Sequence, residues 1–264
     1  MKKFFRTLPL LFFITFVDIS IPAKQVSAQE PVTGLWIARQ MFDRDRGQSS
    51  ASEATMVLVN KNNKKKTRTF SNLRILEDGL ERQLIRFTSP ADIDGTGFLT
   101  VEKPGYETDQ FLYLPALRRT RRIVSSQQSQ RFVNSDFSYE EMKRHPVEDY
   151  NYEIKGETLL SDLSCYILET RPKENTDSQY SLTKSYVVKS SFVPIFIEFF
   201  DKKGKKVKTY KVVKLELKDN IWTEFLVVME DLIRKHKTYI RLDAVEYNLP
   251  IDPEKLSQSS LENY

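Results

Sequence analysis

Residues 192–230 read FVPIFIEFFDKKGKKVKTYKVVKLELKDNIWTEFLVVME, and this stretch decides the fold. Apolar and β-branched residues dominate Phe192 to Phe200, Lys206 to Lys218 and Ile221 to Glu230, which is typical of strands. The turn Asp201-Lys-Lys-Gly204 separates the first two segments, and the next connection is also short. Connections this short join antiparallel neighbours, so the stretch predicts a β-meander.

The rest of the chain repeats this pattern. Further strands are predicted at 55–59, 67–75, 80–87, 97–102, 110–114, 150–156, 165–170, 185–189 and 238–247. Turn dipeptides separate several of them: Asp78-Gly79, Asp94-Gly95 and Pro104-Gly105. About ten or eleven strands with no βαβ spacing predict a mainly β (α+β) protein, built on a large curved sheet or barrel with helices packed on it. Residues 29–264 contain no linker rich in Gly, Ser and Pro, so we expect one domain.

Few segments predict helix. Thr33 to Asp45 places Leu35, Ala38 and Phe42 on one stripe and ends at Arg46-Gly47, which is typical of a short amphipathic helix. Ser138-Tyr-Glu-Glu141 fits a capping box, and Asp252-Pro253-Glu254 fits an N-cap followed by a proline in the first turn.

The first 28 residues have the three parts of a secretory signal peptide. A basic start, Met1 to Arg6, precedes the apolar stretch Leu8 to Val17, and Val26-Ser27-Ala28 offers small residues for cleavage after Ala28. Ten apolar residues are too few for an uncleaved membrane anchor. The only cysteine is Cys165, so cleavage cannot leave a lipid-bearing cysteine. We therefore expect an exported, periplasmic chain that is not itself lipid-anchored.

The composition excludes several kinds of site. The signal peptide carries four of the 41 Lys and Arg, so the mature chain is nearly neutral and nucleic acid is not an expected partner. Cys165 is predicted to be a buried, inert thiol. His145 and His236 belong to no metal-binding or nucleophile-activating spacing, and Asp92 to Gly97 is interpreted as a turn. We expect no metal, no cofactor and no enzyme activity.

The most unusual segment is DQFLYLPALRRTRRI, residues 109–123. Phe111 and Tyr113 alternate with leucines, so this strand is apolar on both faces and is either buried on both sides or in contact with a ligand. Arginines follow at positions 118, 119, 121 and 122, and in an extended chain Arg119 and Arg121 share one face. These arginines either pair with carboxylates such as Asp136 and Glu140 or bind anionic headgroups or a partner.

This segment, together with SDFSYEE at 135–141, resembles the signature of periplasmic outer-membrane lipoprotein-sorting proteins of the LolA-like group. The resemblance extends to RDRG at 44–47 and to TYIRLDAVEYNLPI at 238–251. It points to an extended branch of that superfamily. It implies an incomplete, strongly curved antiparallel β-barrel of about eleven strands, with helices covering its open mouth.

The resemblance also implies a function. The apolar half-barrel would carry the acyl part of a lipid or lipoprotein from an inner-membrane transporter, in this branch often of the resistance-nodulation-division type, towards an outer-membrane acceptor. The alternative is a lipid-responsive sensor or binding module of the same fold that regulates a protein partner. The candidate ligand-binding residues are Trp36, Phe111, Tyr113, Arg119, Arg121 and Phe196.

Two hairpin tips are rich in lysine. One carries Lys61, Lys64, Lys65, Lys66 and Arg68, and the other carries Lys202, Lys203, Lys205, Lys206 and Lys208. We interpret both as solubilising turns, with contact to an anionic membrane surface as the alternative.

Overall fold

The computed structural model describes residues 1, 31–105 and 107–262. The predicted signal peptide and its cleavage after Ala28 therefore lie outside the described residues. Among the described residues, no helix is long and apolar enough to cross a membrane.

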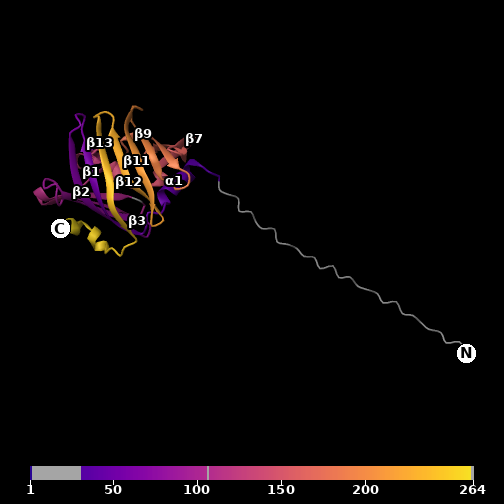
Figure 1. Ribbon diagram of the computed structural model, residues 1–264, viewed down its shortest axis with the longest axis horizontal. Coiled ribbons are helices and arrows are strands. Elements are labelled where there is room, and N and C mark those ends of the chain that lie inside the picture. The colour runs from indigo at the N-terminus through magenta and orange to yellow at the C-terminus, as the bar shows by residue number, and fades with distance from the viewer. Residues whose placement is uncertain (2–30, 106, 263–264) are drawn as a thin grey trace. The chain divides into compact units, whose positions relative to one another are not determined.

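Thirteen strands form one antiparallel sheet in the described part of the chain (Figure 1). The strands are β1 Ser49–Val59, β2 Lys65–Glu77, β3 Leu80–Ser89, β4 Gly97–Glu102, β5 Thr108–Leu114, β6 Arg119–Arg122, β7 Tyr150–Leu160, β8 Leu163–Pro172, β9 Tyr180–Val188, β10 Pro194–Asp201, β11 Lys206–Lys218, β12 Ile221–Asp231 and β13 His236–Tyr247. Their order is β6-β5-β4-β3-β2-β1-β13-β12-β11-β10-β9-β8-β7. The sheet is curved but not closed, because its two edge strands, β6 and β7, do not pair with each other.

Residues 123–149, which join β6 to β7, cover one face of the sheet; we call them the inner segment and this face the inner face. Phe132 and Tyr139 of the inner segment pack on Phe98 of β4, with ring centroids 4.9 and 5.6 Å away. Phe132 also packs on Phe87 of β3 at 6.0 Å. The hollow of the first six strands is therefore filled by the chain's own aromatic side chains.

The C-terminal residues cover the opposite, outer face of β2 to β5 (Figure 1). The 3₁₀ turn Pro253–Leu256 and helix α2 (Gln258–Glu262) bury Leu256 and Leu261 completely. Arg86 of β3 donates hydrogen bonds to the carbonyls of Ser260 and Leu261 at 2.9 and 3.0 Å. A Cβ atom at Gly97 would lie 2.7 Å from a terminal methyl carbon of Leu261, so a larger residue here would force that side chain to shift.

The predicted fold class is confirmed. The described residues form thirteen strands, against an expected total of about eleven. Each of the twelve predicted strand segments overlaps one of them, and β6, in the arginine cluster, is the strand that was not predicted. The predicted N-terminal helix is α1, Gly34–Asp43, but its buried stripe is Gly34, Ile37 and Ala38, while Leu35 is exposed. The predicted cap at Asp252 is present, where the carboxylate accepts the amide of Glu254 at 3.0 Å.

Candidate functional site

Helix α1 lies against the inner face at the β7 end of the sheet. The Thr33 hydroxyl caps it by accepting the amide of Trp36 at 3.1 Å. A Cβ atom at Gly34 would lie 2.7 Å from the carbonyl oxygen of Tyr152, so glycine allows the helix to approach β7 closely. Ile37, which is fully buried, packs in one cluster with Leu168 and Val187.

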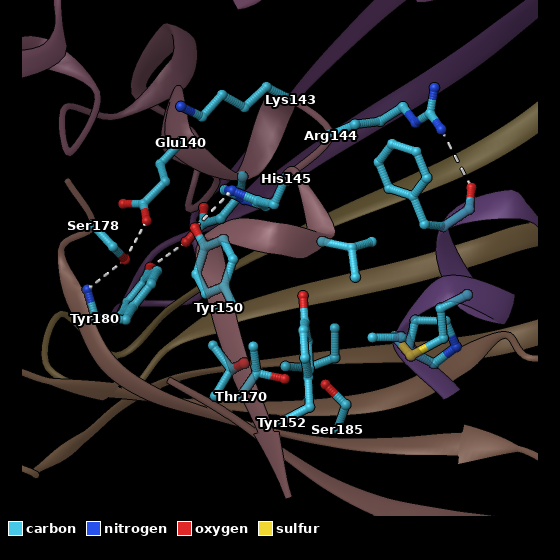
Figure 2. A pocket seen from close by; sticks show the side chains of 18 of the residues that line it. Glu140, Lys143, Arg144, His145, Tyr150, Tyr152, Thr170, Ser178, Tyr180 and Ser185 are labelled. Carbon is cyan, nitrogen blue, oxygen red and sulfur yellow. Dashed lines mark hydrogen bonds between the residues drawn. The ribbon is translucent and has the colours of Figure 1, made fainter. Parts of the chain in front are cut away.

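A pocket of about 320 Å³ lies between α1, the last part of the inner segment and strands β7 to β10 (Figure 2). Its apolar and aromatic lining comes from Ala38, Met41, Phe42, Val147, Tyr150, Tyr152, Tyr180, Pro194, Ile197 and Phe199. Its polar lining comes from Arg44, Arg46, Glu140, Glu141, Lys143, Arg144, His145, Thr170, Ser178, Thr183 and Ser185. This combination of apolar walls with a few polar groups is typical of a small-molecule site.

A histidine and a tyrosine meet at one wall of the pocket (Figure 2). The Nδ1 atom of His145 lies 3.0 Å from the Tyr150 hydroxyl, and the two rings are edge to face with centroids 5.6 Å apart. Burial, with the neighbouring Lys143 ammonium, lowers the pKa of His145 to about 4. Burial likewise raises the pKa of Tyr150. Both groups are therefore neutral near pH 7.

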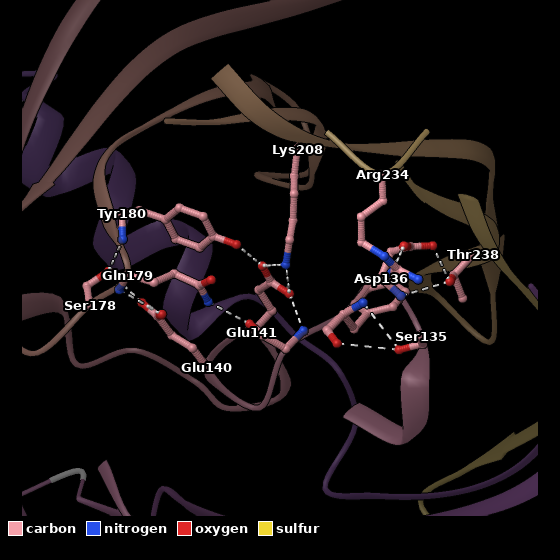
Figure 3. A network of polar contacts seen from close by, with 12 residues as sticks. Ser135, Asp136, Glu140, Glu141, Ser178, Gln179, Tyr180, Lys208, Arg234 and Thr238 are labelled. Atoms are coloured by element: carbon pink, nitrogen blue, oxygen red, sulfur yellow. Dashed lines mark hydrogen bonds and ion pairs between the residues drawn. The ribbon is translucent and has the colours of Figure 1, made fainter. Parts of the chain in front are cut away.

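Two glutamates of the inner segment bind the neighbouring strands through their carboxylates (Figure 3). Glu140 accepts hydrogen bonds from the Ser178 hydroxyl at 2.5 Å and the Gln179 amide at 3.0 Å. Glu141 accepts hydrogen bonds from the Tyr180 hydroxyl and, at 3.0 Å, from the Lys208 ammonium. These contacts fix the inner segment at the pocket wall.

The positive charges around the pocket differ in their partners. Three arginines form ion pairs: Arg44 with Glu224 at 3.1 Å, Arg46 with Glu81 at 2.7 Å and Arg144 with Glu102 at 3.1 Å. Lys143 forms no ion pair with a described residue; Glu140, Asp177 and Asp149 act on it only over longer distances. Burial lowers the pKa of Lys143. Among the cations that line this pocket, the Lys143 ammonium is therefore the one best able to bind an anionic group of a ligand.

The arrangement is suited to binding. The acidic groups of the pocket are already hydrogen-bonded within the protein, and its histidine faces a tyrosine. No group of three or more His, Cys, Asp or Glu residues in the described part of the chain could hold a metal ion. Cys165, predicted to be a buried thiol, is buried, and burial raises its pKa.

The structure places Phe111 and Tyr113 on the outer face, away from this pocket. Both pack in the cluster formed by Leu84, Leu99 and Leu261. Leu112, between them, faces the inner cluster. Of the two alternatives for this strand, the structure shows the first: β5 is buried on both sides, and the C-terminal segment covers its aromatic face.

Arg119 and Arg121 share a face, as predicted. The register pairs Arg119 with Leu114 and Arg121 with Leu112, which places both on the inner side of exposed strand β6. The Arg121 guanidinium lies beside the buried hydroxyl of Tyr139. The arginine cluster does not pair with Asp136 or Glu140, since these carboxylates bind other partners, but Arg122 pairs with the carboxylate of Asp109.

The last two predicted residues, Trp36 and Phe196, do not line the pocket either. Trp36 packs edge to face on Phe192 with ring centroids 5.4 Å apart. Phe196 packs on Tyr186 at 5.5 Å, while Ile197 and Phe199 of the same strand line the pocket. The pocket therefore brings together none of the six predicted residues. Alternation in β10 indicates that Ile197 and Phe199 share a face opposite to Phe196, but it does not show which face lines a pocket.

The comparisons with known proteins agree with this architecture. A family model described as "uncharacterized protein" matches residues 79–263. The chain is 31% identical to a DUF1329 family protein from Desulfovibrio piger, with a TM-score of 0.82, covering 86% of this chain and 97% of the other. It is 26% identical to a putative outer membrane lipoprotein-sorting protein domain from Vibrio parahaemolyticus, with a TM-score of 0.81 and coverage of 87% and 98%. A LolA superfamily protein from Nitrosomonas europaea shares the fold at 16% identity and a TM-score of 0.68, with coverage of 87% and 100%. No curated protein matches the chain.

Proposed function

We propose, since the chain belongs to the DUF1329 family of LolA-like proteins, that it is a non-enzymatic periplasmic carrier for the acyl part of a lipid or lipoprotein. The observation that carries the proposal is the pocket under α1. Its walls combine aliphatic residues of α1 and β10 with three tyrosines, and its volume of about 320 Å³ lies at the small end of the range for ligand sites.

An acyl chain suits this pocket because it needs no specific chemistry to bind. Each buried CH₂ group contributes ~0.8 kcal/mol, so a segment of a few carbons between Met41, Ile197 and Phe199 gives useful affinity. The inner segment occupies the remaining hollow of the sheet. The pocket therefore fits one acyl chain better than several.

The route of the cargo is part of the proposal. The similarity to a lipoprotein-sorting domain supports a place between the two membranes, where an inner-membrane transporter loads the carrier and an outer-membrane acceptor unloads it. The transporter in this proposal is of the resistance-nodulation-division type. The predicted signal peptide provides the export that this location requires.

The test compares two variants that introduce the same charge. Ile197→Asp places a carboxylate in the pocket, whereas Val213→Asp places it on β11 at a residue that is 50% exposed. With a fluorescent fatty acid as probe, we expect binding at least tenfold weaker in Ile197→Asp and unchanged in Val213→Asp, because a charge in an apolar site is strongly unfavourable. Circular dichroism confirms folding of both variants.

Extraction of the purified mature protein with organic solvent, followed by mass spectrometry, identifies the natural ligand. Transfer of that ligand to acceptor vesicles supports the carrier. Equal probe binding by both variants would overturn the assignment of the pocket. Ligand-dependent binding to a regulatory protein without transfer would replace the carrier by a sensor.

A further inference from the structure

Three neighbouring hairpin turns lie at the same end of their strands, along one rim of the sheet. They join β1 to β2, β12 to β13 and β10 to β11, through residues 60–64, 232–235 and 202–205. Because β2, β1, β13, β12, β11 and β10 are consecutive in an antiparallel sheet, these three tips stand side by side (Figure 1). We call them, with the adjoining Lys65 and Lys66, the basic rim.

The basic rim carries lysines that have no acidic partner. Eight of its lysine side chains are exposed and form no ion pair with a described residue: Lys61, Lys64, Lys65, Lys66, Lys202, Lys203, Lys205 and Lys235. Two aspartates flank the rim, and each accepts hydrogen bonds from backbone amides of its own turn. Asp201 accepts the amides of Lys203 and Lys205, both at 2.9 Å, and Asp231 accepts those of Ile233 and Arg234. The rim therefore has a strong excess of positive charge.

An apolar side chain stands among these charges. Ile233, in the middle hairpin, is 55% exposed. The carboxylate of Asp231 accepts its amide at 3.0 Å, and Lys235 closes the turn with a φ of 53°. The hairpin thus leaves more than half of a large aliphatic side chain exposed to solvent.

We infer that the basic rim docks the protein on an anionic phospholipid bilayer. Lysines near such a surface are attracted to it, and an aliphatic side chain between them can enter the interface. Lysine is a point charge on a flexible stem, without the planar fork that arginine offers to one carboxylate. Eight such charges spread over three tips therefore fit a plane of phosphate groups better than a specific acidic site on a protein.

Docking in this way would also orient the pocket. The connection from β8 to β9, residues 173–179, leaves the sheet at the same edge as the basic rim because the strands are antiparallel. Ser178 of this connection and Tyr180 at the start of β9 line the pocket. The strand ends that meet the bilayer are thus the ends near which the pocket residues of β8 and β9 lie.

The experiment measures co-sedimentation of the full mature chain with phosphatidylcholine vesicles, with and without phosphatidylglycerol. We expect binding that requires the anionic lipid and is lost at high salt. Replacing Lys61, Lys64, Lys203 and Lys205 by Gln should weaken it at least 100-fold, at about fivefold for each lysine. Ile233→Ser should weaken it about tenfold with the salt dependence retained.

The matched control replaces four lysines away from the rim by Gln: Lys155, Lys189, Lys214 and Lys218, which pair with acidic neighbours. It should bind vesicles like the parent. Equal binding to neutral and anionic vesicles, or undiminished binding by the rim variant, would overturn the inference, as would rim-dependent capture of an acidic protein without vesicle binding. Fatty-acid affinity is measured on the same variants, so failure of the pocket and failure of the rim are distinguishable.

Discussion

The Oδ2 atom of Asp136 lies 2.6 Å from Nδ1 of His236, so a fully buried carboxylate of the inner segment meets the first residue of β13. The same carboxylate accepts the Thr238 hydroxyl at 2.6 Å and pairs with Arg234 at 3.0 Å. Three side chains of one strand and its preceding turn thereby hold a residue about a hundred positions away in sequence.

Asp136→Ala should destabilise the protein by about 3 kcal/mol, because it leaves the buried partners of the carboxylate without an acceptor. Asp136→Asn should lose less of the free energy of unfolding, since the oxygen of its side-chain amide still accepts a hydrogen bond. The free energy of unfolding in urea measures both. Asp177→Ala, at an exposed position, is the control and should lie within about 0.5 kcal/mol of the parent. A loss of stability no larger than that of the control would show that Asp136 does not anchor the inner segment.

His145 should make stability depend on pH. Its pKa in the folded chain is about 4, below the ordinary value of 6.5, so the unfolded chain takes up the proton first as the pH falls. This contribution to the free energy of unfolding is complete above about pH 6.5 and is lost as the pH falls towards 4. The loss is about 2 kcal/mol near pH 5. Urea titrations at several pH values should therefore show a shallower slope for His145→Gln than for the parent. Parallel curves would contradict the lowered pKa of His145.

Lys143 should favour anionic ligands. Lys143→Met keeps the length of the side chain but removes the charge, so affinity for a fatty acid should fall about tenfold, as expected for a lost hydrogen bond to a charged group. Affinity for the fatty alcohol of the same length should change less than twofold. Competition with a fluorescent probe measures both. An equal loss for acid and alcohol would mean that Lys143 supports the pocket wall without recognising charge.

Phe111 should matter for stability but not for binding in the pocket. Phe111→Ala and Leu261→Ala both open space in the outer cluster and should each cost about 3 kcal/mol. The amount of fatty acid bound per folded molecule should stay that of the parent. If folded Phe111→Ala bound less fatty acid per molecule than the parent, Phe111 would belong to the ligand-binding site.

The fold was largely predictable because strand periodicity and turn residues are local. Segment 97–102 matches β4 at both ends, and the cap at Asp252 and the buried Cys165 were also identified. The last three strands, predicted at 206–218, 221–230 and 238–247, differ from the observed ones by two residues at most.

The site was not predictable in the same way. In a strand that is apolar on both faces, alternation shows which residues share a face but not which face is inside; in β10 it could not distinguish Phe196 from Ile197 and Phe199. In β5 the covering of Phe111 depends on α2, about 150 residues later. His145 and Lys143 gave no signal, because their surroundings come from α1 and β7 to β10.

The open sheet has a mechanical consequence. In a closed barrel the strand number and shear set the radius, so the lumen cannot widen without breaking a seam. Here β6 and β7 are free of each other, and small changes of twist at successive strand pairs add up to a change of curvature while every ladder of backbone hydrogen bonds persists. A change of curvature by bending, with no strand exchanged and no strand pairing broken, is therefore what we expect of this open sheet.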